Sequence, residues 1–228
     1  MRSKQSGFTL VEIAIVLVII GLLLGGVLKG QELINSAKIK NLVNDMNGIS
    51  TAVYGYQDRY KALPGDDLNA SSATTPPGRW AGTAAGDGNA ALTGAFDAAA
   101  GTPEPESRLF WQHLRLAGFI GGETNSAAQP INAVGGIMGV QWGIGNQTVA
   151  PLTQGLAGLV ICHTNILGRI AESLDNQLDD GKPNGGAVRS WRTSPAPTLT
   201  AQASGSTSPD ASYVDDGNTL YTVCKKVI

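Results

Sequence analysis

Charged side chains are scarce in this 228-residue sequence, and the two signs are nearly balanced. Asp, Glu, Lys and Arg make up 15% of the residues, against about a quarter in typical soluble domains. The 16 basic and 18 acidic side chains give a net charge of −2, so there is no basic excess to neutralise nucleic-acid phosphates. We therefore expect no specific nucleic-acid partner.

Cysteine and histidine are equally scarce, with two of each. These numbers exclude a Cys-rich zinc module and a dense disulfide scaffold. The sequence also contains no Gly-x-Ser-x-Gly, His-Glu-x-x-His or phosphate-loop motif. We expect His113 to be a packing or surface residue rather than a ligand. The sequence therefore predicts a protein that is not an enzyme, with an enzyme tethered by a signal anchor as the alternative.

Residues 8–28 form an almost wholly apolar run. At about 1.5 Å per residue, a helix of this length spans roughly 30 Å, the thickness of a bilayer core. Arg2 and Lys4 precede the run, and positive charge favours the cytoplasmic side. The run is longer than the h-region of a secretory signal, and no Ala-x-Ala cleavage site follows it. A plain signal anchor is a second alternative, but it leaves Glu12, a carboxylate inside the apolar segment, unexplained.

The residues Gly7-Phe8-Thr9-Leu10-Val11-Glu12, followed by the apolar run, resemble the prepilin signature of type IV pilins and type II secretion pseudopilins. The resemblance implies cleavage after Gly7 by a prepilin peptidase and N-methylation of the new terminus, Phe8. It also implies an inner-membrane precursor with a cytoplasmic amino terminus and an inner-membrane assembly platform. Copies of this chain or related pilins would be the partners in a helical filament that spans the periplasm or lies outside the cell.

Glu12 has a physical role in such a filament. After cleavage, Phe8 carries a positively charged amine inside an apolar assembly, where an unpaired charge is unfavourable. We hypothesise that Glu12 of one subunit pairs with the Phe8 amine of its neighbour and so sets the axial register. The alternative is a carboxylate that is simply protonated and tolerated.

The helix is expected to continue from Phe8 to about Tyr60. Beyond residue 30 the apolar residues recur at three- and four-residue spacing, which indicates one buried stripe. Gly48 and Gly55 argue against the alternative, a coiled coil. Many pilins carry a proline in this helix, whereas none occurs here before Pro64. Whether the helix partly melts on assembly therefore stays open, with glycines as possible weak points or close-contact sites. The apolar stripe comprises Ile39, Leu42, Met46, Ile49, Val53, Tyr56 and Tyr60.

These patterns predict an α+β fold, a pilin-like lollipop in which a long amino-terminal helix packs on a small antiparallel β-sheet head. The expected divisions are a leader (1–7), a transmembrane and polymerisation half-helix (8–30), an amphipathic half-helix (31–61) and a globular head (62–228). Within the head, a Pro-Gly-Asp turn at 64–66 precedes a loop-rich stretch that ends near residue 105. We expect helices at 106–120 and 164–178, the second capped by Asn165. Strands are expected at 136–144, 158–162 and 219–227, with an exposed loop at 194–212.

Cys162 and Cys224 fall in two of the expected strands. The head lies outside the cytoplasm on this topology, where disulfides persist. A carboxy-terminal disulfide loop is also what the pilin resemblance implies. Two free buried thiols remain the alternative.

Four acid-rich turns offer the oxygen ligands that calcium prefers. None matches the twelve-residue EF-hand loop, and Asp, Asn and Gly also make ordinary turns. We therefore expect no resident cofactor, with calcium binding left open. The turns lie at 66–67, 86–89, 179–181 and 215–218.

The function that the sequence favours is a structural subunit of a type IV pilus-like filament. It would be made as a prepilin, cleaved after Gly7, methylated at Phe8 and polymerised through its amino-terminal helix. The alternative is a type II secretion pseudopilin, or a minor pilin of a short export or DNA-uptake filament.

Overall fold

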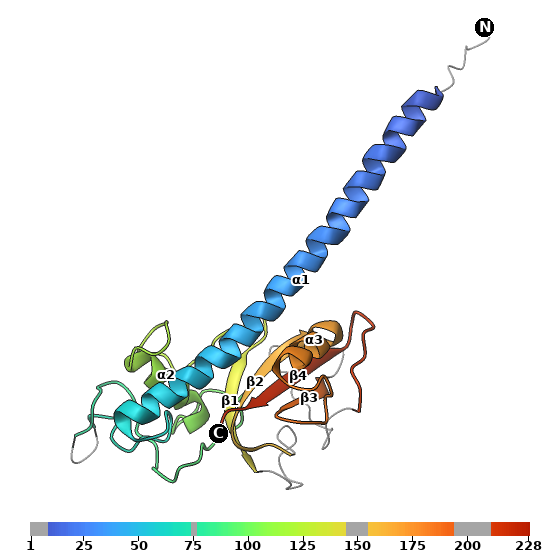
Figure 1. The fold of residues 1–228 in the computed structure, drawn as a ribbon. Coiled ribbons are helices and arrows are strands. Elements are labelled where there is room, and N and C mark those ends of the chain that lie inside the picture. The colour runs from blue at the N-terminus through green and yellow to red at the C-terminus, as the bar shows by residue number, and fades with distance from the viewer. Residues whose placement is uncertain (1–8, 74–76, 145–154, 194–210) are drawn as a thin grey trace. The chain divides into compact units, whose positions relative to one another are not determined.

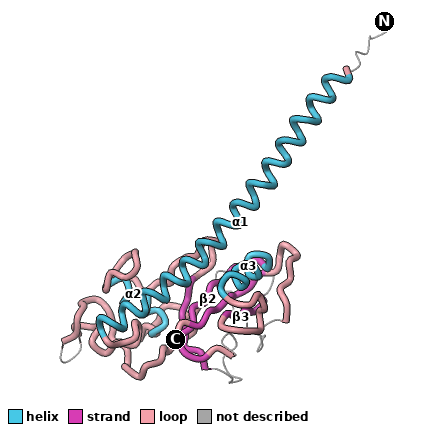
Figure 2. The backbone as a smooth tube through the Cα atoms, viewed as in Figure 1, coloured by secondary structure: helices cyan, strands magenta, loops and turns pink. Residues whose placement is uncertain are grey.

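The computed structural model describes residues 9–73, 77–144, 155–193 and 211–228. The fold class is α+β, as predicted: a 51-residue helix, α1 (Leu10–Tyr60), and one four-stranded antiparallel sheet (Figure 1). Figure 2 shows how much of the remaining chain is loop. The chain divides into two compact units, Met1–Lys38 and Ile39–Ile228, which we describe one at a time.

The first unit consists of the amino-terminal part of α1. An 18-residue window of this helix has a mean hydropathy of 2.8, and none of it is buried. By length and composition α1 can cross a membrane, which confirms the predicted transmembrane helix. So large an exposed apolar surface calls for lipid or protein neighbours. The exposed apolar side chains are Leu10, Val11, Ile13, Ile15, Val16, Leu17, Val18, Ile19, Ile20, Leu22, Leu23, Leu24, Val27, Leu28, Leu33 and Ile34.

The second unit begins with the carboxy-terminal part of α1, which is amphipathic. Its buried residues recur every three or four positions and therefore share one helix face. They match the predicted stripe, except that Ala52 joins it and Tyr60 is only half-buried. The buried residues are Ile39, Leu42, Met46, Ile49, Ala52, Val53 and Tyr56.

The sheet has the strand order β1-β2-β4-β3, and all neighbours are antiparallel. Its strands are β1 (Met138–Ile144), β2 (Ala157–Leu167), β3 (Val188–Thr193) and β4 (Leu220–Lys226). The three strands expected from the sequence are confirmed in β1, β2 and β4. Strand β3, an edge strand that pairs with β4, was not expected from the sequence.

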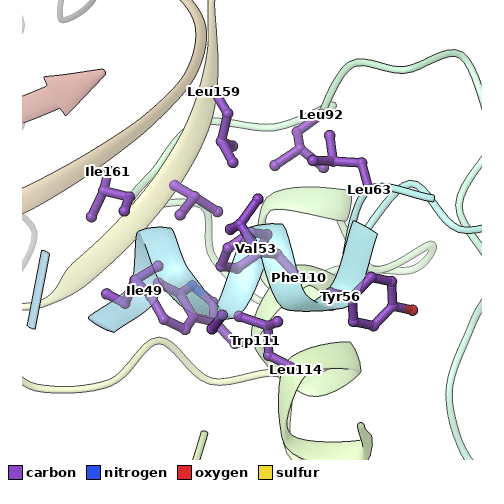
Figure 3. Packing of buried hydrophobic residues seen from close by; sticks show 12 residues of the cluster. Ile49, Val53, Tyr56, Leu63, Leu92, Phe110, Trp111, Leu114, Leu159 and Ile161 are labelled. Atoms are coloured by element: carbon purple, nitrogen blue, oxygen red, sulfur yellow. The ribbon is translucent and has the colours of Figure 1, made fainter. Parts of the chain in front are cut away.

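The main core forms where α1, α2 (Glu106–Leu116), β1 and β2 contribute apolar side chains to one cluster. Figure 3 shows Val53 of α1 packed among side chains of α2 and β2. Helix α2 was expected over residues 106–120 and ends four residues earlier, just before Gly118 at φ 76°. The cluster comprises Ile49, Ala52, Val53, Tyr56, Leu63, Leu92, Phe110, Trp111, Leu114, Val140, Leu159 and Ile161.

Alternation along β2 separates two clusters on opposite sheet faces. Leu159 and Ile161 join the main core, whereas Val160 and Cys162 join a second cluster that includes Trp191. The apolar stripe of α1 therefore covers one face of β2, and the cysteine lies on the other.

Residues 164–167 correct the sequence analysis. They were expected to begin a helix capped by Asn165, but they extend β2, and α3 spans only Gly168–Leu178. Asn165 adopts a φ of +64° where the pairing of β2 with β4 shifts register, a conformation that Asn tolerates better than most residues. Pairing of Ile166 with Tyr221 of β4 favours the strand over the helix.

The described residues between 62 and 105 form the expected loop, and buried carboxylates organise it. Asp66, which is 4% exposed, accepts hydrogen bonds from the amides of Gly88, Asn89 and Ala90. Most of the expected loop at 194–212 lies outside the described residues.

Candidate functional site

The amino terminus carries the sequence-predicted processing and assembly residues. Gly7 and Phe8 lie outside the described residues, and Glu12 is exposed in the first turn of α1. Its Oε2 accepts two hydrogen bonds of 2.8 Å from Thr9, one from the amide and one from the hydroxyl. The Glu12 amide in turn donates to Thr9 Oγ1 over 3.3 Å.

This reciprocal pair is a capping box, in which Thr and Glu three positions apart satisfy amides at a helix start. Within the described part of the chain, Glu12 Oε1 makes no hydrogen bond, so one carboxylate oxygen stays uncommitted. The role expected for Glu12 from the sequence rested on its charge alone and did not include Thr9. The Thr-x-x-Glu spacing was the signal that could have revealed it.

Four glycines interrupt the apolar surface of α1 without interrupting the helix. A Cβ added at Gly21, Gly25, Gly26 or Gly30 would meet no atom within 4 Å. Packing within the described chain therefore does not require glycine at these positions. Small residues on an apolar helix do permit close approach of a second helix.

Residues 2–28 match the family described as the prokaryotic N-terminal methylation motif. The chain carries this motif. The methylation motif is the signature of type IV pilins and pseudopilins, so the predicted resemblance is confirmed at the amino terminus. The motif supports a pilin-like or pseudopilin subunit, and the family that carries it is structural rather than catalytic. Together with the apolar helix, the motif fits a membrane-anchored precursor. A search for similar curated proteins finds no match to this chain.

The structure joins Cys162 and Cys224 in a disulfide. The two residues are register partners on β2 and β4, and both are fully buried. The bond therefore links the two central strands of the sheet on the face that also holds Trp191.

Two of the four acid-rich turns are held by ordinary hydrogen bonds. Asp67 accepts from the hydroxyl of Tyr56 over 2.7 Å and pairs with Arg79. Asp216 accepts from the amides of Thr219 and Asn218 and from the Thr219 hydroxyl, which lowers its pKa to about 2. These carboxylates are committed to the fold.

A first acidic cluster lies beside the loop at residues 86–93. Asp66, Asp87 and Glu106 can each place an oxygen within 4.8 Å of the others. Glu106 accepts from the amides of Asp87 and Thr93, as Asp66 does from three other amides. Burial still raises the pKa of Asp66, although the amides of Ala90 and Gly88 oppose the shift.

A second acidic cluster, Asp175, Asp179 and Asp180, lies at the carboxy-terminal end of α3. Asp175 is fully buried, and Oδ2 accepts from the Tyr213 hydroxyl over 2.6 Å. Burial raises the pKa of Asp175 to about 6; the Tyr213 hydrogen bond opposes the shift, and the charges of Asp180 and Asp179 add to it. The sequence indicated the turn at 179–181 but not Asp175, whose burial depends on tertiary packing.

Both histidines are buried. His113, which was expected to be a packing or surface residue, is therefore a packing residue. His113 Nδ1 accepts from the Gly65 amide, and Nε2 lies 3.0 Å from the Ala84 carbonyl oxygen. Burial lowers the pKa of His113 to about 4 and that of His163 to about 3. Neither ring nitrogen of His163 has a hydrogen-bond partner among the described residues.

Proposed function

We propose that this chain is a structural subunit of a type IV pilus-like filament. In this proposal it is made as an inner-membrane prepilin with its amino terminus in the cytoplasm. A prepilin peptidase cleaves it after Gly7, and Phe8 is methylated. The mature chain then polymerises through residues 8–30, while residues 62–228 form the head of the subunit.

The observation that carries this proposal is the methylation motif placed directly before a helix whose apolar side chains are exposed. Filament assembly would replace the lipid around these side chains with neighbouring helices. Because lipid tails are as apolar as the side chains, the gain comes from close packing rather than from escape from water. The glycines of α1 favour such packing.

Glu12 supplies specificity in this proposal. Cleavage removes Arg2 and Lys4, which leaves 14 basic side chains against 18 acidic ones, and creates an amine at Phe8. Before assembly, Thr9 holds one oxygen of Glu12. In the filament, the Phe8 amine of a neighbouring subunit pairs with the carboxylate. A charge in an apolar core has a less unfavourable free energy when an opposite charge lies beside it than when it is unpaired.

Mass spectrometry of the mature protein purified from its native cells tests the proposal. The expected amino terminus is a methylated Phe8. Gly7→Val should leave the leader attached and keep the chain in the membrane, whereas Ser6→Ala, one residue earlier, should be processed like the wild type. Electron microscopy with immunolabelling should then place the processed chain in surface filaments. A mature polypeptide that still begins at Met1 would contradict the proposal.

A further inference from the structure

A cavity of about 640 Å³ lies at the carboxy-terminal end of α1. Its walls come from the last turn of α1, from the loop that follows and from β1. Among the residues that line it, Leu63 is buried, whereas Leu68 and Asn69 are exposed to solvent, so a ligand can enter. Cavities that hold small ligands have volumes of roughly 300 to 1,000 Å³. The size of this cavity therefore suits a small molecule.

Trp142 of β1 gives the cavity an aromatic wall. The side chain packs on the main core yet is only half-buried. No aromatic ring or cation among the described residues stacks on it, whereas Trp80 and Trp111 each contact another ring. An indole ring carries negative charge density on its faces, which attracts the polarised C–H bonds of a sugar ring. Trp142 therefore offers a stacking surface that the described chain leaves unused.

Three polar side chains in the cavity lining make no hydrogen bond within the described chain. They are the amides of Gln57 and Asn69 and the hydroxyl of Tyr60. Each of these groups can both donate and accept a hydrogen bond, as a sugar hydroxyl does. Neighbouring hydroxyls of one sugar ring would therefore find matching partners in this cavity.

The fold holds these three residues in place. Gln57 and Tyr60, three positions apart, lie on one face of α1, and the Arg79 guanidinium lies 4.5 Å from the centre of the Tyr60 ring. The backbone amide of Asn69 donates to Oδ1 of Asp67 over 2.9 Å, and its carbonyl oxygen accepts from the Arg79 amide over 2.8 Å. Because the backbone of Asn69 is fixed and its side chain is free, a ligand has little of the site to order on binding.

The charged residues that line the cavity already have partners. Asp66 accepts from three backbone amides, and Asp67 pairs with Arg79. The Lys61 ammonium pairs with the Asp58 carboxylate over 3.1 Å. The described lining therefore offers no uncommitted charge to a phosphate, a carboxylate or an ammonium group, which favours an uncharged ligand.

A second cavity, of about 490 Å³, provides the contrast. Glu104, Arg108 and Glu123 line it, and none of the described residues around it is aromatic. The side-chain amide of Gln112 there already donates to two carbonyl oxygens and accepts from a hydroxyl. This cavity lacks both the stacking surface and the free amides of the first.

We propose that the cavity at the end of α1 binds a neutral saccharide. One sugar ring stacks on Trp142, and its hydroxyls form hydrogen bonds with Gln57, Tyr60 and Asn69. The same chemistry recognises a free sugar and a unit of a polysaccharide. The proposal does not depend on filament assembly, because the residues that line the cavity lie outside the polymerising segment at 8–30.

Saturation-transfer NMR of the full chain tests the proposal with cellobiose, lactose and N,N′-diacetylchitobiose as probes. The chain is kept in lauryldimethylamine oxide, because a sugar-headed detergent would compete for the cavity. At least one disaccharide should bind with a Kd of roughly 0.1 to 10 mM, since an accessible cavity buries only part of its ligand. The absence of binding by all three at about 10 mM overturns the proposal.

Two further probes define the ligand. Cellotetraose that binds more tightly than cellobiose indicates a polysaccharide, and equal binding indicates a free sugar or a chain end; either result supports a saccharide site. The blocked peptide acetyl-leucyl-leucine amide tests an apolar docking groove instead. If that peptide binds in preference to every saccharide, the proposal is overturned.

Matched variants locate the site. Asn69→Ala removes a free amide and keeps the backbone hydrogen bonds of Asn69, so saccharide binding should weaken about two- to tenfold without loss of the fold. Trp142→Leu keeps an apolar contact with the core but removes the stacking surface, and should weaken binding roughly fivefold. Asn125→Ala makes the same change beside the second cavity and should bind like the wild type. Wild-type affinity in both Asn69→Ala and Trp142→Leu, or an equal loss in Asn125→Ala, overturns the assignment.

Discussion

The hydroxyl of Tyr56 on α1 donates a hydrogen bond of 2.7 Å to Oδ2 of Asp67, and both side chains are buried. Asp67 also pairs with Arg79, and its Oδ1 accepts from the Asn69 amide. This network attaches the carboxy-terminal end of α1 to the loop at residues 62–105, whose described residues form no helix or strand. The loop is therefore anchored to α1 by this polar network as well as by Leu63 and Leu92, which join the main core.

Tyr56→Phe should destabilise the second unit. The change removes one donor to a buried carboxylate and leaves the ring in place, so the expected loss is about 2 kcal/mol of unfolding free energy. For a unit of this size that loss lowers the Tm by roughly 4 to 8 °C. Thermal unfolding monitored by tryptophan fluorescence measures it.

Tyr54→Phe is the matched control for this substitution. The Tyr54 hydroxyl donates to the Val227 carbonyl oxygen over the same 2.7 Å, but Tyr54 is 51% exposed. Water can replace the lost donor there, so the Tm should fall by much less. Equal Tm values for Tyr56→Phe and Tyr54→Phe would show that burial of the hydrogen bond to Asp67 adds nothing to the stability of the second unit.

Acid should destabilise the second unit through its two buried histidines. The folded-state pKa values, about 4 for His113 and about 3 for His163, lie below the ordinary value of about 6.5. The stability that this difference provides is present above pH 6.5 and is lost as the pH falls toward these lower values. Each histidine then contributes a loss of about 2 kcal/mol at pH 5.

His163→Leu isolates the contribution of one histidine. The variant should resemble the wild type or exceed its Tm at pH 8, because His163 has no hydrogen bond to lose among the described residues. At pH 5 the unfolding free energy of the variant relative to the wild type should be about 2 kcal/mol more favourable to the variant than at pH 8. Asp175, with its raised pKa, changes stability in the opposite direction over this range, but it does so equally in both proteins. A stability difference between variant and wild type that stays constant from pH 8 to pH 5 would contradict the claim that His163 is buried and neutral.

The elements that the sequence predicted are those with a strong local period. The stripe on α1 follows the three- and four-residue spacing, so its buried face could be read directly. Strand β3 lacks such a period because it contains Arg189 and Arg192, and its pairing with β4 decides its conformation. Residues 164–167 were ambiguous for the same reason, and the register of β2 against β4 decided for a strand.

The candidate sites differ in the same way. Glu12 could be identified because a carboxylate inside an apolar run is conspicuous at any level of structure. Asp175 could not, since its burial depends on Tyr213, which lies 38 positions away in the sequence. Only the folded arrangement shows that Oδ1 of this carboxylate lacks a hydrogen-bond partner among the described residues.

Loss of the disulfide should destabilise the sheet. The bond between Cys162 and Cys224 closes a loop with a sequence separation of 62 residues, which corresponds to about 4 kcal/mol of chain entropy in the unfolded state. The double variant Cys162→Ala/Cys224→Ala should therefore unfold at a markedly lower temperature than the oxidised wild type. Reductant should lower the Tm of the wild type and leave that of the double variant unchanged. Free thiols that react with an alkylating agent in the native, unreduced protein would contradict the disulfide.

Substitutions at Glu12 separate its two roles, helix capping and charge pairing. Glu12→Gln keeps an oxygen that accepts from the Thr9 amide and hydroxyl, so the start of α1 is preserved while the charge is lost. Glu12→Ala removes both the accepting oxygen and the negative charge. On the proposed function, both variants insert and are cleaved, and neither enters filaments at the wild-type level, because neither offers a negative charge to the Phe8 amine of a neighbour.

Thr9 provides the complementary pair of variants. Thr9→Ser retains the hydroxyl and should assemble normally, whereas Thr9→Val keeps the shape and the amide but loses one of the two donors to Glu12. Since charge pairing with the neighbour does not use that hydroxyl, Thr9→Val should assemble far better than Glu12→Gln. Incorporation is measured as the fraction of processed chain in sheared filaments. If Glu12→Gln assembled like the wild type while Thr9→Val failed, the capping box and not the charge would be the feature that assembly requires.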